Sequence, residues 1–230
     1  MEPEIRDLQN FLNRMGAKIE GAGTNVIKIT GVKKLKDVSY NIMPDRIEAG
    51  TFLCAAGATV GKLKLNNVVP EHIGPIISKL EECGCNFEIN KNNIVMEAPK
   101  KLKSVDIKTM PYPGFPTDMQ SVFIAMLCIA KGTSIVVENI FENRFKFANE
   151  LKRMGAKINI EGKVAIIKGV RKLSGATVEA TDLRGGAAVV VAGLIAKGKT
   201  RVNNIEYILR GYEGLDKKLS KIGANIKVEK

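Results

Sequence analysis

A fourfold recurrence constrains the fold of this chain more than any other feature of its sequence. Four short segments read RMGAK, ECGCN, RMGAK and KIGAN, and their glycines are Gly16, Gly84, Gly155 and Gly223. The spacings between successive glycines are 68, 71 and 68 residues. Self-similarity at a fixed period indicates a fold built from neighbouring copies of one supersecondary unit. We therefore expect a series of related units that share one core.

Each repeat glycine follows a segment with the pattern of an amphipathic helix. Apolar residues stand one, four and eight positions before every glycine, as Met15, Leu12 and Leu8 do before Gly16. This spacing places the apolar side chains on one helical face. Glycine is the residue expected just past a helix C-terminus, where the backbone needs a positive φ. The sequence thus predicts four helices that end at the repeat glycines.

Strands and a second kind of helix complete each predicted unit. Runs typical of strands follow the first three glycines, at residues 26–29, 94–96 and 164–167. A second helix should open behind Asp45, Asp118 and Asp182, because an aspartate N-cap accepts the free backbone N–H groups of the first turn. These second helices are apolar nearly all round, and such helices must be buried on every side. We expect the helices inside and the sheets outside.

Charge and composition narrow the function classes. The chain has 230 residues and a formal net charge of +12, which permits anionic partners. Its lysines are scattered, however, and no tryptophan and only four tyrosines supply stacking surfaces for nucleic acid. The longest run without a charged or polar side chain, residues 185–196, is shorter than the about twenty residues that cross a bilayer. We expect a soluble, cytoplasmic protein that binds neither membrane nor nucleic acid. A non-catalytic basic repeat protein that binds nucleic acid is the alternative.

Cysteine and histidine are too few to indicate a metal site. The cysteines are Cys54, Cys83, Cys85 and Cys128, and His72 is the single histidine. Cys83 and Cys85 form a C-x-C without a second pair. Cys54 and Cys128 lie in apolar stretches, where a free thiol behaves as a small hydrophobe. We expect reduced, mostly buried thiols and no bound metal.

Five motifs carry a resemblance to a known family. They are PDRIEAGTFL (residues 44–53), PYPGFPTDMQ (111–120), IFENRF (140–145), TDLRGGAA (181–188) and LRGYE (209–213). Their order and spacing resemble the C-terminal half of the UDP-N-acetylglucosamine 1-carboxyvinyltransferases, over essentially the whole chain. The resemblance implies an α/β fold, the inside-out α/β barrel of enolpyruvyl transferases. In that fold, six βαβ-type units form two globes with helices inside and sheets outside.

The chain order of this family implies a division of the sequence. A family member starts in one globe, builds the second globe and returns to finish the first. Residues 1–42 would then be the tail of the second, incomplete globe, and residues 43–230 most of the first globe. The first globe would contain a first unit (about 43–109), a second unit (about 110–180) and a third unit (about 181–230). The chain opens with an amphipathic helix that lacks its preceding buried helix, which we interpret as truncation.

The resemblance implies transfer of the enolpyruvyl group of phosphoenolpyruvate to the 3-hydroxyl of UDP-N-acetylglucosamine, with release of phosphate. In the family this is the first committed step of peptidoglycan synthesis. The reaction requires a base for the hydroxyl, an acid for the vinyl carbon and cations for two phosphorylated ligands, and it implies no metal or organic cofactor. The implied partners are the two substrates and the missing N-terminal half of the enzyme. A relative that acts on shikimate 3-phosphate is the enzymatic alternative, against which GFPTDMQ and FENRF argue.

Asp118 and Arg210 are the catalytic residues that the resemblance implies. Asp118 matches an aspartate that contacts the sugar 3-hydroxyl, and an ordinary N-cap is its structural alternative. Arg210 matches an arginine that grips phosphoenolpyruvate, since a guanidinium can hold a carboxylate or phosphate through two parallel hydrogen bonds. An exposed surface arginine is the alternative for Arg210. Leu209 stands where the family usually has an acidic residue, which leaves the orientation of Arg210 open.

Other residues match substrate-binding positions of the family. Arg144 occupies the repeat position that holds Ile5, Ile73 and Tyr212 in the other copies, which suggests a role outside the core. The family places this arginine near the ligands, and a solvated arginine at a helix start is the alternative. The remaining matches are a threonine beside the catalytic aspartate, two residues of the uridine pocket and three residues of a cleft loop: Thr117, Ile140, Phe141, Asp182, Leu183 and Arg184.

Some of these matches also have purely structural interpretations. Ile140 and Phe141 would equally suit the core of a strand, and Arg184 an exposed first turn. For Asp45, Arg46 and Glu48, we expect helix capping and salt bridges between the globes rather than chemistry.

Parts of the family's catalytic machinery have no counterpart in this chain. These are its lysine–asparagine pair and the cysteine of a mobile loop that donates the proton. Cys54 and Cys128 fall within predicted buried helices, where a thiolate is disfavoured. We therefore expect the chain alone to be inactive. Fosfomycin, which alkylates the loop cysteine of the family, should leave its mass unchanged.

Overall fold

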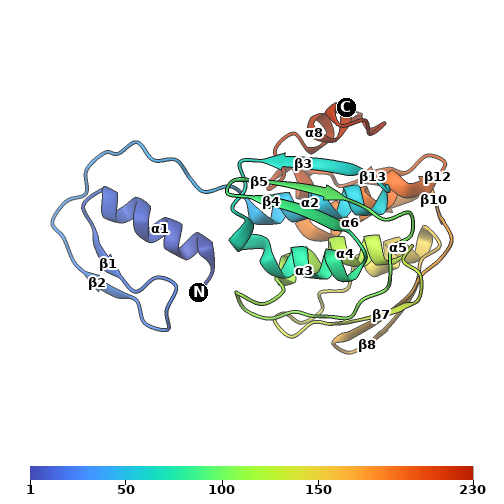
Figure 1. Cartoon of the computed structure of the whole chain (residues 1–230), viewed down its shortest axis with the longest axis horizontal. Helices are drawn as coiled ribbons and strands as arrows, with labels where there is room; N and C mark the ends of the chain where they lie inside the picture. The colour runs from blue at the N-terminus through green and yellow to red at the C-terminus, as the bar shows by residue number, and fades with distance from the viewer. Residues whose placement is uncertain (230) are drawn as a thin grey trace.

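Three helices that are apolar on nearly every face form the centre of the larger part of the molecule. The computed structural model describes residues 1–229 and packs α2 (Arg46–Ala58), α4 (Thr117–Leu127) and α6 (Leu183–Ile195) against one another (Figure 1). The prediction that these segments lie innermost is confirmed, because residues 119–127 of α4 and 185–192 of α6 are all buried. Among the described residues, no helix is both long enough and apolar enough to span a bilayer.

Amphipathic helices end at the repeat glycines, as predicted. They are α1 (Pro3–Arg14), α3 (Gly74–Glu82) with the preceding 3-10 turn η1 (Pro70–Ile73), α5 (Ala148–Arg153) and α8 (Leu215–Lys221). Gly16, Gly84, Gly155 and Gly223 have φ angles of 100°, 99°, 93° and 102°. An L side chain is disfavoured at these angles, because its Cβ would crowd the backbone carbonyl. The glycines therefore stop the helices at regular intervals.

Sheets lie outside the helices in the first and second units. The first sheet is antiparallel, in the order β3-β5-β4, and consists of β3 (Lys62–Asn66), β4 (Asn86–Asn90) and β5 (Asn93–Glu97). The second has the order β6-β7-β9-β8 and consists of β6 (Ile107–Lys108), β7 (Thr133–Val137), β8 (Lys157–Glu161) and β9 (Val164–Lys168). In both sheets, a hairpin pairs its second strand with an earlier strand. The two units thus repeat one topology.

The strands on either side of α6 are shorter. β11 (Thr177–Glu179) pairs in parallel with β13 (Arg201–Asn203), as β6 pairs with β7. The short strands β10 (Leu173–Ser174) and β12 (Ala196–Lys197) are also parallel, and α7 (Glu206–Leu209) follows β13. Within residues 1–229, no hairpin completes the β11-β13 sheet in the way that β8 and β9 complete the second sheet. The inside-out α/β arrangement is confirmed, and no strand of the described part of the chain lies at the far edge of β13.

The N-terminal region stands beside this body and contains α1 and the antiparallel strands β1 (Lys18–Glu20) and β2 (Lys28–Thr30) (Figure 1). Residues 31–45 connect it to α2 without a helix or strand. Arg46 at the start of α2 donates to Glu4 of α1, with Nε 2.7 Å from Oε1. Its guanidinium also lies 5.6 Å from the ring centroid of Tyr112. The ion pair joins the N-terminal region to the body, and a domain boundary near residue 42 stays a prediction.

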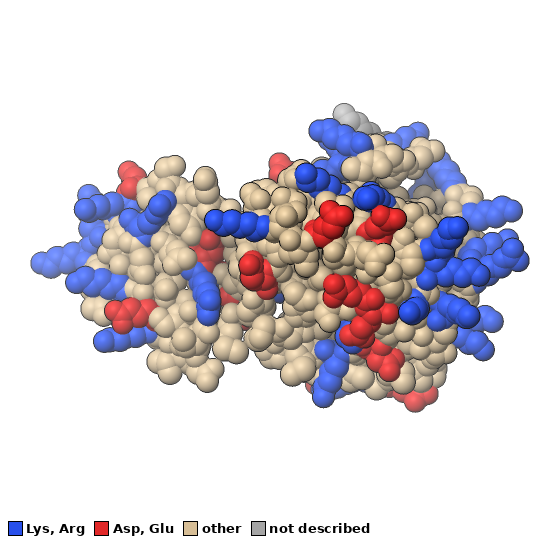
Figure 2. Space-filling view, in the orientation of Figure 1, with Lys and Arg blue, Asp and Glu red and all other residues tan. Residues whose placement is uncertain are grey.

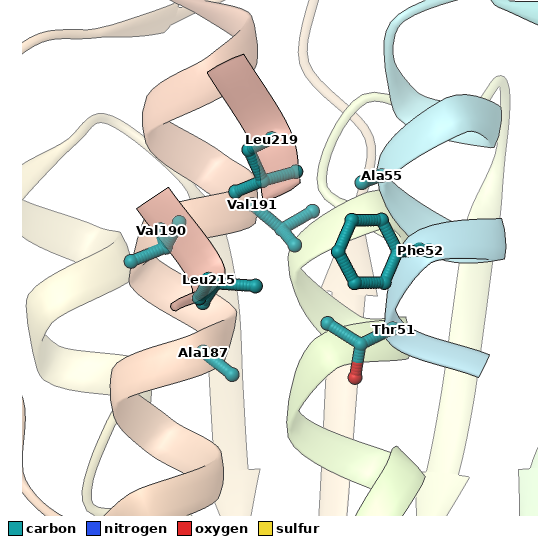
Figure 3. Close-up of a pocket in the computed structure, with 8 residues that line it drawn as sticks. All are labelled: Thr51, Phe52, Ala55, Ala187, Val190, Val191, Leu215 and Leu219. Carbon is teal, nitrogen blue, oxygen red and sulfur yellow. The ribbon is translucent and has the colours of Figure 1, made fainter. Parts of the chain in front are cut away.

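Helix α8 covers the seam between α2 and α6. Phe52 of α2, Val191 of α6 and Leu219 of α8 point toward one another there (Figure 3). At the edge of this seam, Thr51 Oγ1 lies 2.9 Å from Tyr212 Oη, and both residues are buried. Buried hydroxyl groups are tolerated when they are hydrogen-bonded. This contact therefore fixes the loop before α8 to the first unit.

Charged side chains cover the surface of both parts of the molecule. Figure 2 shows lysine and arginine densest at the end of the body farthest from the N-terminal region, and acidic side chains mainly across its middle. Some of the basic side chains are paired, because Glu229 accepts from Lys199 at 3.4 Å and from Arg201 at 2.8 Å. Exposed pairs of this kind contribute little to stability. They fit a solvated, lysine-rich surface.

The four cysteines are buried free thiols, as predicted. Burial raises the pKa of Cys83 and Cys128 to about 12 and the pKa of Cys85 to about 11. Burial also raises the pKa of Cys54 well above its usual value. A thiolate is the reactive form of cysteine, so these positions are poorly suited to proton transfer or alkylation at neutral pH.

Close packing around α6 can be tested with two glycine substitutions. Gly186→Ala should destabilise the chain by about 1–3 kcal/mol through overpacking, because its Cβ would lie 2.5 Å from Ile208 Cγ1 and 3.0 Å from Ala180 Cβ. Gly193→Ala is the matched control, since its nearest heavy atom, in Thr200, would lie 3.4 Å away. Alanine has a higher helix propensity than glycine, so Gly193→Ala should leave the free energy of unfolding unchanged or raise it by up to about 1 kcal/mol. Urea unfolding followed by circular dichroism measures the stability of both variants. Equal stabilities of Gly186→Ala and Gly193→Ala would contradict the close packing at Gly186.

The thiols should resist alkylation in the folded chain. With pKa values of about 11 to 12 for Cys83, Cys85 and Cys128, roughly one molecule in ten thousand or fewer holds a given thiolate at pH 7. Intact mass after treatment with iodoacetamide should stay unchanged without denaturant and rise by four adducts in urea. Rapid labelling of the native chain would show that at least one thiol is accessible.

Candidate active site

The N-terminal ends of the three buried helices differ in one respect. Asp45 and Asp182 cap α2 and α6 as predicted, and each accepts hydrogen bonds from two N–H groups of the first turn at 2.7–3.0 Å. In α4 the N-cap is Pro116, and Asp118 is the second residue of the helix. The prediction that Asp118 is an N-cap is therefore wrong. Because the chain enters α4 through a proline, the carboxylate of Asp118 is left to face other side chains.

Asp118 lies between two arginines. Arg144 Nη2 donates to Asp118 Oδ1 at 2.6 Å, and Arg184 Nη2 donates to Asp118 Oδ2 at 3.1 Å. The side chain of Asp118 is 40% exposed, whereas those of Arg144 and Arg184 are 22% and 13% exposed. Arg144 follows the end of β7, and Arg184 is in the first turn of α6. The structure thus joins the second and third units through one half-exposed carboxylate and two largely buried cations.

Aromatic rings lie against both guanidinium groups. The guanidinium of Arg144 is 5.3 Å from the ring centroid of Phe141, and that of Arg184 is 5.5 Å from the ring centroid of Tyr212. Cations are attracted to the faces of aromatic rings at such distances. Burial opposes the charge of Arg184, but Tyr212 and Asp118 outweigh it and raise the pKa of Arg184. Arg184 therefore stays a cation despite its burial.

Phe141 and Ile140 lie in the loop after β7, and the structure does not place them in a strand. Both are exposed, so the alternative of a strand core is excluded for them. Their backbone N–H groups donate to the buried Glu138, as does the hydroxyl of Thr117. Sequence reasoning missed Glu138. An acidic residue directly after the apolar strand 133–137 is the one signal that pointed to it.

Arg210 is exposed at the C-terminal end of α7. Within the described residues its side chain makes no hydrogen bond or ion pair, and its backbone N–H donates to Glu206 O at 3.3 Å, so no hydrogen bond or ion pair joins it to Asp118. Its neighbour Gly211 packs closely on Leu183, because a Cβ at Gly211 would lie 2.8 Å from Leu183 Cδ2. Two residues after Arg210, Tyr212 lies under Arg184. The loop that carries Arg210 is therefore anchored beside the start of α6, and the guanidinium of Arg210 itself faces solvent.

The charged residues at the start of α2 belong to structural contacts. Asp45 caps the helix and Arg46 joins α2 to α1, as expected. Glu48 differs from the expected bridge between globes, because it accepts from Lys218 of α8 within the body at 2.5 Å. These contacts leave the starts of α4 and α6 as the candidate site.

The candidate site is suited to binding an anion. It combines two guanidinium groups with the N-terminal end of α4, where backbone N–H groups favour negative charge. Arg184 Nε is buried and has no hydrogen-bond partner within residues 1–229. A carboxylate lies at the same place and is accessible enough to accept a proton. Among the described residues, no group of three or more His, Cys, Asp or Glu side chains gathers as metal ligands.

Comparison with known proteins shows the family. The chain matches the family model described as EPSP synthase (3-phosphoshikimate 1-carboxyvinyltransferase) over residues 1–219. It is 57% identical to a UDP-N-acetylglucosamine 1-carboxyvinyltransferase of Desulfofundulus thermocisternus, over 96% of this chain and 91% of that protein. It is 58% identical to UDP-N-acetylglucosamine 1-carboxyvinyltransferase 2 of Caldanaerobacter subterraneus subsp. tengcongensis, over 98% of this chain and 54% of that protein. The chain thus spans about half the length of several curated relatives that it matches.

Solved structures agree with this assignment. The enolpyruvyl transferase NikO from Streptomyces tendae superposes with a TM-score of 0.86 at 28% identity, over 99% of this chain and 55% of that one. An EPSP synthase from Acinetobacter baumannii superposes with a TM-score of 0.74 at 19% identity, and this likeness shows the fold alone. With the family match and the identities above 50%, the chain belongs to the EPSP synthase family and, within it, to the UDP-N-acetylglucosamine 1-carboxyvinyltransferases.

Proposed function

We propose that this chain is the C-terminal half of a cytoplasmic enzyme that transfers the enolpyruvyl group of phosphoenolpyruvate to the 3-hydroxyl of UDP-N-acetylglucosamine. The reaction releases phosphate and would be the first committed step of peptidoglycan synthesis. The observation that carries the proposal is Asp118 between Arg144 and Arg184 at the starts of α4 and α6. Curated relatives of that name are 54–58% identical to the chain, whereas the EPSP synthase structures are only 19–20% identical. The shikimate alternative therefore has less support.

Asp118 would act as the general base. The hydroxyl oxygen attacks C2 of phosphoenolpyruvate while C3 gains a proton, and the phosphate then leaves as C3 loses a proton and the double bond returns. An aspartate can accept the hydroxyl proton in concert with formation of the C–O bond. Both oxygens of Asp118 accept from arginines here. A phosphorylated ligand that binds one of these guanidinium groups would free an oxygen, so substrate binding itself would prepare the base.

The arginines would hold the phosphorylated ligands. Arg144 and Arg184 already lie at the proposed site, and Arg210 would reach phosphoenolpyruvate when a second wall closes over it. Thr117, Asp182 and Leu183 shape the starts of α4 and α6, and the exposed loop of Ile140 and Phe141 would contact the uridine. These assignments rest on the family positions and on the contacts around Asp118.

A missing N-terminal half would supply the second wall of the cleft. We propose that residues 1–42 are the tail of the second globe and residues 43–230 most of the first. Among residues 1–229, no strand lies beside the far edge of β13, and Leu8, Val26 and Ile29 of the N-terminal region are exposed. An unpaired strand edge and exposed apolar residues both favour contact with further chain.

The chain alone should release no phosphate from phosphoenolpyruvate and UDP-N-acetylglucosamine. Asp118 is 40% exposed, and an ion pair at 4 Å in water is worth only about 1 kcal/mol. Excluding water from a closed cleft strengthens such interactions. We also expect the proton donor to be lacking, because all four cysteines are buried with raised pKa values.

The test compares the chain with a hybrid enzyme, in which the N-terminal half of the Caldanaerobacter relative precedes this chain. Phosphate release should appear in the hybrid enzyme only. Robust release by the purified chain would contradict the need for a second half. A folded but inactive hybrid enzyme would contradict the proposed reaction.

Asp118→Asn should lower turnover of the hybrid enzyme by roughly 10²–10⁴-fold, the range expected for loss of a general base. Its binding of UDP-N-acetylglucosamine should change far less. Asp45→Asn is the matched control, because asparagine caps a helix about as well as aspartate, and its turnover should stay near normal. Steady-state phosphate release and calorimetric titration measure the two effects. Near-normal turnover of Asp118→Asn would remove Asp118 from the mechanism.

A further inference from the structure

Glu138 is a buried carboxylate that receives four hydrogen bonds. It follows the last residue of β7 and is 1% exposed. Its Oε1 accepts from Thr109 Oγ1 at 2.8 Å, from the N–H of Ile140 at 2.8 Å and from the N–H of Phe141 at 3.1 Å. Its Oε2 accepts from Thr117 Oγ1 at 2.8 Å. Two of these partners are backbone N–H groups, which can only donate, so Glu138 acts as an acceptor toward the loop at 140–141.

No cation balances this carboxylate within the described part of the chain, where Glu138 forms no salt bridge. A buried carboxylate is unfavourable unless its lone pairs are hydrogen-bonded. The hydrogen bonds that satisfy Glu138 come from two separate segments. One segment runs from Thr109 at the end of β6 to Thr117 at the start of α4, and the other is the loop at 140–141. Glu138 therefore connects two segments that are separated in the sequence.

Each of these segments carries one partner of the ion pair at the candidate site. Thr117 directly precedes Asp118, and the loop at 140–141 leads within three residues to Arg144. Arg144 Nη2 and Asp118 Oδ1 are 2.6 Å apart. The same buried carboxylate thus fixes the backbone on both sides of the Asp118–Arg144 pair.

The loop between Thr109 and Thr117 is also held by Tyr112, whose hydroxyl donates to Glu71 O at 3.3 Å, and by the buried Phe115, which packs on Phe123. Met110 N donates to Phe115 O at 3.0 Å, and this bond closes the loop on itself. Asn139 N donates to Thr109 Oγ1 at 2.9 Å, which brings the loop end back to the segment after Glu138. Both ends of the loop bond to residues 138–139, so Glu138 contributes to the position of the start of α4.

We propose that Glu138 is a positioning residue for the enolpyruvyl transfer. It does not touch substrate. It acts by fixing the relative position of Asp118 and Arg144 through Thr117 and the loop at 140–141. The inference rests on the proposed function of the Asp118 site. A displacement of about 1 Å at a reacting group can lower a rate by about a hundredfold, so the relative position of Asp118 and Arg144 matters for turnover.

The first experiment measures kinetics in the hybrid enzyme. Thr117→Val removes the bond to Glu138 Oε2 and keeps the side-chain shape, and Glu138→Gln replaces one acceptor by a donor. We expect kcat to fall by about ten- to a hundredfold, with KM for UDP-N-acetylglucosamine and the melting temperature nearly unchanged. Thr133→Val is the matched control, because Thr133 is an exposed threonine of β7 whose hydroxyl makes no hydrogen bond within residues 1–229. It should behave as wild type.

Combination with Arg144→Lys separates positioning from general support of the fold. If Glu138 acts through the Asp118–Arg144 pair, Glu138→Gln should lower kcat by a much smaller factor in the Arg144→Lys variant than in the wild type. The effects of coupled residues are not additive. Additive losses would overturn the proposal. So would a Glu138→Gln variant that loses melting temperature and keeps its kcat.

The second experiment does not depend on activity. In the 230-residue chain labelled with ¹⁵N-arginine, the side-chain signal of Arg144, assigned by Arg144→Lys, should move toward that of a free arginine in Thr117→Val and Glu138→Gln. The signal of Arg153, whose Nη1 is 3.0 Å from Glu150 Oε2, should stay unchanged as an internal control. An unmoved Arg144 signal would overturn the proposal. An inactive wild-type hybrid enzyme would instead overturn the proposed function, and the Arg144 signal alone would then decide the role of Glu138.

Discussion

The burial of three apolar helices is the constraint on which the rest of this structure depends. α2, α4 and α6 have no polar face, so water must be excluded from them on every side. Amphipathic helices and sheets supply that cover in the first and second units, and α8 supplies it over the seam between α2 and α6 (Figures 1 and 3). Charged groups cannot lie among these helices without partners. They are therefore confined to helix ends and loops, and the starts of α4 and α6 become the place where charge gathers.

The polar contacts at these helix ends join all three units. Thr51 of the first unit contacts Tyr212 of the third, the ring of Tyr212 lies under Arg184, and Arg184 shares Asp118 of the second unit with Arg144. Each contact crosses from one unit to another or fixes a loop to a helix. A ligand that draws one arginine away from Asp118 would consequently alter contacts in more than one unit. Such a network is suited to a site whose base must be released by the substrate.

The repeat, the helix ends and the buried helices could be predicted from sequence because each depends on local spacing. Glycine positions and apolar periodicity report directly on backbone angle and on burial. The role of Asp118 at the helix start could not be predicted in this way, since Pro116 and Asp118 are both acceptable near a helix N-terminus and only the path of the chain into α4 decides between them. Glu138 was missed for a related reason. Its four partners lie in segments that come together only in the folded chain, so no spacing in the sequence reveals them.

Differences between the repeats locate the site more sharply than their likeness does. At the position eleven residues before the repeat glycine, the first unit has the buried Ile73 and the third the buried Tyr212, whereas the second has Arg144. At the helix start, the first and third units use an aspartate cap, whereas the second has Pro116 as its cap and Asp118 binds two arginines instead. Both departures fall in the same unit and meet in one ion pair. Residues that would stabilise the fold in the other copies are thus replaced in the second unit by groups that bind charge, and the neighbouring copies supply the rigid frame that holds them.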